Sequence, residues 1–388
     1  MAWGVKQVSV QRLAFVMRAE GGKESMTALC REFEISRPTG YLWLERSRQV
    51  ERLEELGEQS RRPQNSPRKT SEEAEQKVVE ARRQRPDWGA RKLQGVLARE
   101  QVKLPVVTIH RILLRCGMVR KQDRPRQATQ RFERAAPNQL WQMDFKGMPN
   151  SVQDCVPWTL LDDHSRFLPA LRQLTSTKAE PVRACLADTF REHGQPEAML
   201  FDHGTPWWNH ESQWGWTWLS VWIMRQGIRL ILSGKGHPQT QGKVERFHKT
   251  LEAGMFHRPK SARTDWQTWL DAFRQEYNHV RPHEALAMRT PAERWHPSPR
   301  PYLENPPAWS YASAAGEVLK VLSNGCVRYR GHHYFVGRAF TGQAVQLQPL
   351  QHRLVVMLCR TPVRELDPST HASHELDWDQ SHAQTNGL

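Results

Sequence analysis

Apolar residues in the first part of the chain recur at helical spacing. In the stretch MTALCREFEISRPTGYLWLERSRQV, Leu29 and Phe33 lie four residues apart, as on one helical face. After a short break, Ser36 is placed to cap a second helix. Two short helices joined by a tight turn indicate a helix-turn-helix, although many helical pairs of this kind bind no DNA. The candidate nucleic-acid contacts on the second helix are Arg37, Thr39 and Tyr41.

A second helical unit is predicted between residues 73 and 120. Leu93 and Leu97 share one helical face, and Ile109 and Leu113 share a face of the next helix. We interpret this unit as a second helix-turn-helix, and two such units would let one chain hold a long DNA site. The same spacing predicts that two further candidate DNA contacts face outward, Thr108 and Arg111.

From residue 139 the pattern changes to short apolar segments that are typical of strands. LWQMDFKGM, EAMLFD and IRLILS have the length of strands, and CVPWTLLDDHSRFLPALRQL divides into two strands around a turn. Helices are predicted at 178–193, at 212–226, from residue 239, and over 262–295. Strands that later alternate with helices predict an α/β domain with a mixed sheet.

The C-terminal part alternates apolar and polar residues, with turn signals at Asn324-Gly325 and Gly331, which predicts a small β-barrel. Stretches rich in Pro, Ser and Arg without apolar periodicity are predicted linkers. The predicted organisation is a helix-turn-helix domain at 1–56, a linker at 57–72, a second helix-turn-helix at 73–120, a basic linker at 121–137, an α/β core at 138–297, a connector at 298–315, a β-barrel at 316–365 and a disordered tail at 366–388.

The charge of the chain narrows the class of partner. Lys and Arg number 56 against 41 Asp and Glu, so the net charge is +15. Nucleic acid is the commonest partner of such a surface, because each cation that meets a phosphate releases a condensed counterion. A basic protein without a polyanionic partner is an alternative, and an anionic membrane is a weaker one because no basic amphipathic helix stands out.

The sequence also argues against a membrane or secreted protein. It contains no apolar run of about 18 residues, and because its first residues, MAWGVKQVSVQR, lack an apolar stretch followed by a cleavage site, we expect no signal peptide. Its six cysteines are scattered without a C-x-x-C pair, which indicates neither a zinc knuckle nor a disulfide framework. We therefore expect a location in the reducing cytoplasm.

Three carboxylates stand out by their positions. Asp144 lies within the apolar segment LWQMDF, Asp202 ends the segment MLFD, and Glu245 lies on the helix that begins in HPQTQGKVERFHKT. A charged carboxylate beside a buried strand costs folding free energy unless it is paired or bound to a cation. All three can converge at one edge of a sheet, and ligand sets made only of oxygen suit Mg²⁺ or Mn²⁺.

Two such ions about 4 Å apart would perform a defined reaction. One lowers the pKa of a water or a 3′-hydroxyl, and the other stabilises the leaving oxygen. We expect Asp144 to bridge both ions, with Asp202 on one and Glu245 on the other.

The motifs together resemble those of the DDE transposases of bacterial insertion sequences, whose catalytic core is like that of retroviral integrase. The resemblance covers roughly residues 10 to 300. The motifs that carry it are WQMDF around Asp144, LLDDHSRF from Leu160 to Phe167, FDHGTPW around Asp202, HPQTQGKVERFHKTL around Glu245, and YNHVRPHEALAMRTPAERW from Tyr277 to Trp295.

This resemblance implies a ribonuclease-H-like core with Asp144, Asp202 and Glu245 as the metal ligands. It implies hydrolysis at the ends of a mobile element, followed by attack of the 3′-hydroxyl on target DNA, and a homo-multimer that brings two ends together. Asp162 and Arg166 match a turn that supports the structure, and the run NHVRPHEAL matches a packing element after the core.

The sequence departs from many relatives in two places. The interval between Asp202 and Glu245 is longer, and the added length falls in the Trp-rich stretch WWNHESQWGWTWLSV. His203 stands where relatives often carry Asn. Trp207 and Trp208 are candidates for contact with DNA or with another protein, whereas buried packing is predicted for Trp218 and Trp222.

Cations at three-residue spacing follow the start of the predicted catalytic helix, where they would form a phosphate track. A simpler alternative is an ordinary helical ion pair between Glu245 and Lys249. The candidates for phosphate contact are Lys243, Arg246 and Lys249.

Two other functions remain open from the sequence. One is a DNA-binding repressor of the element that has lost catalysis, although all three carboxylates are present. The other is a metal-dependent nuclease that cuts DNA without joining it. The two predicted helical DNA-binding units argue against this nuclease, because they favour recognition of specific DNA ends over general cleavage.

Overall fold

The computed structural model describes residues 8–49, 70–119, 133–147, 156–174, 176–209, 215–233, 242–257 and 265–376. The chain divides into two compact units, Met1–Thr70 and Ser71–Leu388. The predicted linkers at 57–72 and 121–137 fall largely outside the described residues. Within the described ranges no helix is both long and apolar enough to cross a membrane.

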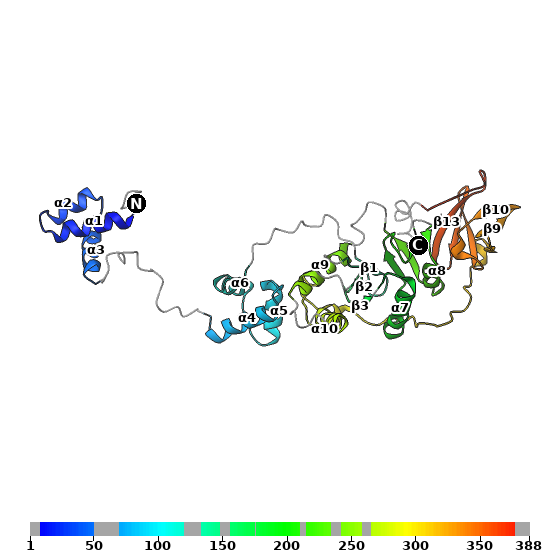
Figure 1. The fold of residues 1–388 in the computed structure, drawn as a ribbon, viewed down its shortest axis with the longest axis horizontal. Coiled ribbons are helices and arrows are strands. Elements are labelled where there is room, and N and C mark those ends of the chain that lie inside the picture. The colour runs from blue at the N-terminus through cyan, green and yellow to red at the C-terminus, as the bar shows by residue number, and fades with distance from the viewer. Residues whose placement is uncertain are drawn as a thin grey trace. The chain divides into compact units, whose positions relative to one another are not determined.

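Within residues 8–49, the first unit contains three helices, α1 (Val8–Glu20), α2 (Met26–Glu32) and α3 (Arg37–Gln49) (Figure 1). Phe15, Leu29 and Trp43 form the centre of its core. Ser36 accepts a hydrogen bond from the backbone N–H of Thr39 at 3.3 Å, so it caps α3 as the sequence predicts.

The second unit begins with three helices, α4 (Glu72–Gln84), α5 (Ala90–Arg99) and α6 (Val106–Arg115). Leu93 and Leu97 of α5 and Ile109 and Leu113 of α6 are buried, as their spacing predicts. They pack around Trp88, whose exposed fraction is 1%, in one apolar core.

The α/β core is built on a mixed sheet in the order β3-β2-β1-β4-β7. Strands β1 and β2 and strands β2 and β3 pair antiparallel, whereas β4 pairs parallel with both β1 and β7. The predicted mixed sheet is therefore confirmed. Its strands are β1 (Trp141–Phe145), β2 (Val156–Asp162), β3 (Ala170–Leu174), β4 (Ala198–Phe201) and β7 (Arg229–Leu232).

Helices cover both faces of this sheet, because the strand residues alternate between them. Leu160 of β2 belongs to the apolar cluster that contains α7 (Ala179–His193) and α8 (Trp218–Arg225). Leu161, the next residue, belongs to the cluster that contains α9 (Gly242–Phe256) and α10 (Trp266–His279).

Two helix predictions need correction at their ends. The helix predicted at 212–226 begins only at Trp218, after a hairpin of β5 (Trp208–Asn209) and β6 (Gly215–Trp216). The helix predicted over 262–295 ends at His279, because Pro282 cannot continue it. Short 3₁₀ turns at Glu284–Leu286 and Pro291–Arg294 follow.

The C-terminal part is an open sheet rather than the predicted closed barrel. Its order is β14-β13-β12-β11-β8, and β9 and β10 form a separate two-stranded sheet, so β14 and β8 remain edges. The strands are β8 (Glu317–Lys320), β9 (Cys326–Tyr329), β10 (His332–Phe335), β11 (Ala344–Leu350), β12 (Arg353–Leu358), β13 (Thr361–Asp367) and β14 (Ala372–His374).

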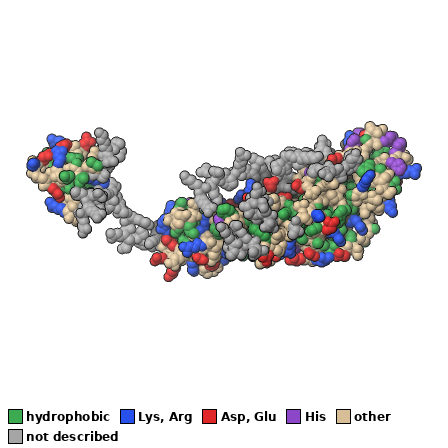
Figure 2. Space-filling model, viewed as in Figure 1, with side chains coloured by type: hydrophobic (Ala, Val, Ile, Leu, Met, Phe, Trp, Pro, Cys, Tyr) green, Lys and Arg blue, Asp and Glu red, His purple; other side chains and the backbone are tan. Residues whose placement is uncertain are grey.

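The predicted disordered tail begins too early. Strand β13 continues to Asp367, and Ala372–His374 form β14, whereas residues 377–388 lie outside the described residues. Histidines gather on this domain (Figure 2). The rings of His332 and His371 stack there with their centroids 3.8 Å apart.

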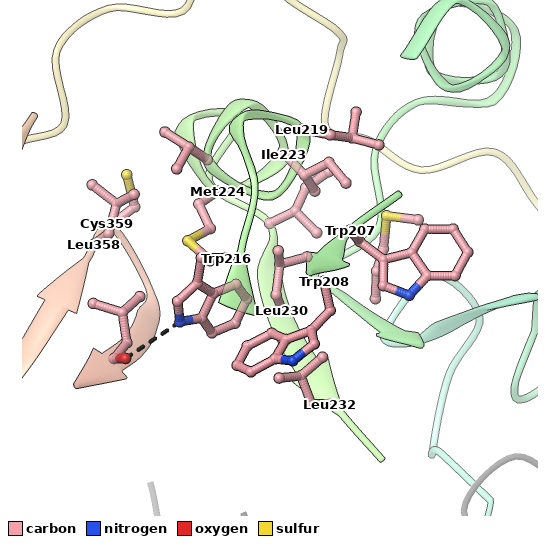
Figure 3. Packing of buried hydrophobic residues seen from close by; sticks show 14 of the residues in the cluster. Trp207, Trp208, Trp216, Leu219, Ile223, Met224, Leu230, Leu232, Leu358 and Cys359 are labelled. Carbon is pink, nitrogen blue, oxygen red and sulfur yellow. Dashed lines mark hydrogen bonds between the residues drawn. The ribbon is translucent and has the colours of Figure 1, made fainter. Parts of the chain in front are cut away.

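The C-terminal sheet packs directly against the α/β core. Thr361 Oγ1 of β13 accepts a hydrogen bond from the backbone N–H of Leu230 in β7 at 3.0 Å. Trp216 of the β5–β6 hairpin donates its indole N–H to the carbonyl of Val363 at 3.3 Å (Figure 3). One apolar cluster therefore runs through both domains.

Candidate active site

The first carboxylate lies on the central strand of the mixed sheet. Asp144 and Gln142 of β1 share a face, and Asp144 is in register with Thr159 of β2. The opposite face of β1 carries Met143, which is fully buried in the apolar core. The side chain of Asp144 is 21% exposed, and its Oδ1 accepts a hydrogen bond from the backbone N–H of Phe145 at 2.8 Å.

The second carboxylate follows β4, the parallel neighbour of β1. Parallel strands end at the same edge of a sheet, which brings Asp202 toward Asp144. Asp202 Oδ1 accepts hydrogen bonds from the backbone N–H of Gly204 at 2.9 Å and from the indole N–H of Trp207 at 3.1 Å. The same indole N–H donates to the carbonyl oxygen of Asp202 at 2.9 Å.

The third carboxylate, Glu245, lies exposed in the first turn of α9. The start of this helix is fixed by two contacts to the sheet. The backbone N–H of Val244 donates to Oε1 of Gln142 at 3.3 Å, and Lys243 Nζ lies 2.6 Å from Oδ1 of the fully buried Asp163. The strand that carries Asp144 therefore also positions the helix turn that carries Glu245.

The three carboxylates act on one another electrostatically. Burial and, to a smaller extent, the charges of Asp202 and Glu245 raise the pKa of Asp144 to about 7, against the opposing effects of the Phe145 N–H and Lys146. Among the described residues, no group of three or more His, Cys, Asp or Glu side chains is gathered closely enough to hold a metal ion. The carboxylates are thus close enough to perturb Asp144, but their oxygens are not drawn together at ligand distances.

The sequence analysis missed His248, which lies one turn after Glu245 on the buried face of α9. Its Nδ1 is 3.5 Å from Oδ2 of Asp144, and its Nε2 is 3.1 Å from Oγ1 of Thr159. Burial, with a smaller effect of Lys146, lowers the pKa of His248 to about 4, so the imidazole is neutral at pH 7. The signal in the sequence was a histidine within the apolar spacing of Val244 and Leu251.

The turn after β2 supports the structure, as the resemblance implies. Asp162 is fully buried, and its Oδ1 accepts hydrogen bonds from the backbone N–H and the hydroxyl of Ser165. Arg166 has a φ of 63° and forms an ion pair with Glu133 at 2.8 Å. Asp163 was not singled out in the sequence, yet it holds the ammonium of Lys243.

The candidate DNA contacts lie on three different helices. On α3, Arg37 and Tyr41 are exposed, and Thr39 is half-buried against Ser36. On α6, Arg111 is exposed and Thr108 is half-buried.

The three cations of α9 differ in their surroundings. Arg246 and Lys249 are exposed, and the described contacts include no ion pair between Lys249 and Glu245. The ammonium of Lys243 is half-buried and already engaged by Asp163. Phosphate contact by these three residues stays a prediction.

Two predictions for the tryptophans are wrong. Trp207 and Trp208 are only 1% and 4% exposed, so their rings are packed in the core and not offered to DNA or to a partner (Figure 3). Trp207 stacks on Phe145 with centroids 5.7 Å apart. Trp218 is instead 44% exposed on α8, where burial was expected, and Trp222 is half-buried.

The residues at this edge fit a divalent cation. Asp144 is half-buried, and its pKa is raised first by this burial and then by the negative charges of Asp202 and Glu245 nearby. The available donors are carboxylate oxygens, which suit Mg²⁺ or Mn²⁺. The neutral imidazole of His248 adds no positive charge that would oppose such an ion.

Comparison with known proteins gives matches for the α/β core and for the helical units. The family description "Integrase core domain" matches residues 134–238 and again residues 226–291, which together span the mixed sheet, α9 and α10. A homeodomain-like domain matches residues 39–113. The chain is 27% identical over 233 residues to an uncharacterised 31.7 kDa protein of insertion element IS407 from Burkholderia multivorans, covering 56% of this chain and 78% of the relative. These matches support an insertion-sequence transposase with an integrase-like core.

Solved structures similar to this chain include the HTLV-2 integrase catalytic core domain in complex with magnesium. Its trimeric form is 12% identical, covers 42% of this chain and 99% of that chain, and has a TM-score of 0.31. The dimeric form is also 12% identical, covers 41% of this chain and 97% of that chain, and has a TM-score of 0.30.

Proposed function

We propose that the chain binds the ends of a mobile DNA element and catalyses metal-dependent DNA cleavage and strand transfer. The observation that carries this proposal is the arrangement of Asp144, Asp202 and Glu245 at one edge of an integrase-type sheet, where burial and the charges of Asp202 and Glu245 raise the pKa of Asp144 to about 7. The metal ligands would be these three carboxylates, holding two Mg²⁺ or Mn²⁺ ions. When bound, the ions supply an activated water or 3′-hydroxyl and stabilise the leaving oxygen.

The neighbouring residues hold the carboxylates in place. Trp207 and the Gly204 N–H orient the Asp202 carboxylate, and Gln142 fixes the first turn of α9 beneath Glu245. His248 contacts Asp144 from the buried side and remains neutral at pH 7. Contacts of this kind around metal ligands favour a defined ligand geometry.

The proposed partner is double-stranded DNA, both as element ends and as target. The net charge of +15, the homeodomain-like match and the exposed Arg37 and Arg111 support this assignment. Joining two ends to one target requires at least two active sites, so we propose a homo-multimer assembled on DNA. A cytoplasmic location, in association with the nucleoid, completes the proposal.

A strand-transfer assay tests the function. The substrate is a labelled DNA end from the flanking terminal repeats with a plasmid target, in Mg²⁺, in Mn²⁺ and in EDTA. Asp144→Asn removes the central carboxylate, and Asp188→Asn removes an exposed carboxylate on α7 as a matched control. We expect metal-dependent joining that only Asp144→Asn abolishes.

Two results would redirect the proposal. Specific binding of the ends without cutting or joining in either metal would indicate a catalytically inactive repressor of the element. Metal-dependent cutting without any joined product would indicate a nuclease.

A further inference from the structure

The segment after α10 forms an interface with the second helical unit. Arg281 is only 6% exposed, and its Nη1 lies 3.0 Å from Oδ2 of Asp87, which precedes α5. The guanidinium of Arg281 also lies 5.2 Å from the ring centroid of the buried Trp88. A buried, paired guanidinium on an aromatic ring is a typical centre of a specific interface.

The backbone of α5 approaches this segment closely. A Cβ added at Gly95 would lie 2.9 Å from Cγ of Pro282, so only glycine fits there without a shift. Val280 packs against the apolar core of the helical unit. The contact is therefore tight as well as charged.

Three further ion pairs surround this centre. Arg85 of the α4 C-terminus pairs with Glu276 at 3.0 Å. On α5, Arg91 lies 3.8 Å from Glu284, and Arg99 lies 3.4 Å from Glu293. In these three ion pairs the arginine belongs to the helical unit and the glutamate to the core. In the central pair the charges are exchanged, because Arg281 belongs to the core and Asp87 to the helical unit. Such a pattern selects one relative orientation, because a shifted register would bring like charges together.

The interface leaves the proposed DNA-binding helix available. Arg91, Gly95 and Arg99 lie at i, i+4 and i+8, so they share one face of α5. The exposed Arg111 belongs to a different helix, α6, whose buried residues Ile109 and Leu113 face the interior of the unit. The unit can thus contact the core through α4 and α5 while α6 faces DNA.

We propose that this interface holds the second helical unit in one position on the catalytic core and thereby sets where along an element end the DNA is cut. The inference rests on the proposed function and assigns a role to the run NHVRPHEAL beyond packing. A fixed distance between α6 and the carboxylates converts recognition of an end sequence into cleavage at one phosphodiester.

The test maps cleavage positions at single-nucleotide resolution on a labelled element end with the full-length chain. The variants are Arg281→Asp, Asp87→Arg and the double charge exchange, with Arg99→Glu and its exchange partner Glu293→Arg as milder changes at exposed positions. Arg191→Glu, which breaks an exposed ion pair with Glu304 outside this interface, is the matched control.

We expect Arg281→Asp to retain end binding within roughly twofold while cleavage at the wild-type position falls roughly tenfold or more and cuts spread to neighbouring nucleotides. The double exchange should restore the wild-type position, and Arg191→Glu should leave it unchanged. Hydrogen exchange of the full chain should rise in 90–99 and 276–284 in Arg281→Asp and fall back in the double exchange.

The opposite results overturn the inference. Arg281→Asp that cuts at the wild-type position at the wild-type rate would show that the interface does not set the cut. A double exchange that restores hydrogen exchange without restoring the position of cleavage would assign the interface to stability alone. Absence of any cleavage by the wild-type chain would instead refute the proposed function, and this inference with it.

Discussion

The indole N–H of Trp207 lies 3.1 Å from Oδ1 of Asp202 and 2.9 Å from the carbonyl oxygen of the same residue. The indole ring stacks on Phe145, the neighbour of Asp144 in β1. One buried tryptophan therefore contacts the loop of the second carboxylate and the strand of the first. The Trp-rich stretch after Asp202 begins with a residue that orients a proposed metal ligand.

Replacing Trp207 by Phe should weaken the proposed metal site without unfolding the core. The variant keeps an aromatic ring beside Phe145 but loses the hydrogen bond to a charged acceptor, which is worth roughly 1.5–3 kcal/mol, or about tenfold to a hundredfold in affinity. Titration of Mn²⁺ into the full chain should show this loss, with Trp222→Phe on α8 as the control. Equal Mn²⁺ affinity in wild type and Trp207→Phe would remove Trp207 from the site.

The raised pKa of Asp144 predicts a pH-dependent stability. The folded-state pKa of about 7 exceeds the unfolded value near 4, so the folded protein binds the extra proton between these pH values. The stabilisation of the folded state by the protonated Asp144 is complete below about pH 4, and it is lost as the pH rises through 7. In metal-free buffer at pH 8, Asp144→Asn should therefore be more stable than wild type, by a few kcal/mol at most because each pKa unit is worth about 1.4 kcal/mol.

Urea unfolding of both proteins in EDTA at several pH values between 5 and 8 measures this difference. The comparison cancels titrating groups that lie far from Asp144 and that both proteins share. A difference that stays constant from pH 5 to pH 8 would contradict the pKa assigned to Asp144. Added Mg²⁺ should stabilise wild type more than the Asn variant.

Thr361→Val tests the attachment of the C-terminal sheet to the core. Valine keeps the shape of the threonine but leaves the buried backbone N–H of Leu230 without its acceptor, which should cost about 1–3 kcal/mol of unfolding free energy. Thr341→Val, at an exposed position in the same domain, is the control and should change stability little. A Thr361→Val protein as stable as wild type would mean that the two domains do not depend on this contact.

Arg111→Ala tests α6 as a DNA-binding helix. If the exposed Arg111 contacts a phosphate, the substitution should weaken binding of the element end and reduce the slope of log affinity against log salt by about 1. Arg191→Ala on α7 removes the same charge elsewhere and should leave the slope nearly unchanged. An unaltered slope in Arg111→Ala would place the DNA on another surface.

The sequence predicted the elements of the core because their signals are local. The apolar segments around Asp144 and Asp202 are short enough to identify as strands, and parallel pairing brings their ends to one edge. Glu245 has the weakest local signal of the three carboxylates, because a single acidic residue on an amphipathic helix has no feature of its own that marks it as a ligand, and the family resemblance strengthened its assignment. The cap at Ser36 was predictable for the same local reason.

The features that the sequence did not predict depend on distant partners. Arg281 pairs with Asp87 across 194 positions, and Lys243 pairs with Asp163 across 80, so neither pairing leaves a periodic signal. The burial of Trp208 follows from its packing on Trp216 in a short hairpin. The open C-terminal sheet differs from a barrel only in how its edge strands pair, which alternation within each strand does not encode.

The most direct test of the account is strand transfer in Mg²⁺ by three single variants, Asp144→Asn, Asp202→Asn and Glu245→Gln, beside the control Asp188→Asn. Binding of the element end is measured in parallel, so that loss of joining is separated from loss of the complex. The account predicts that all three variants bind the end and that none joins it, whereas Asp188→Asn joins it at the wild-type rate. Wild-type joining by any one of the three would contradict a single metal site built from these carboxylates.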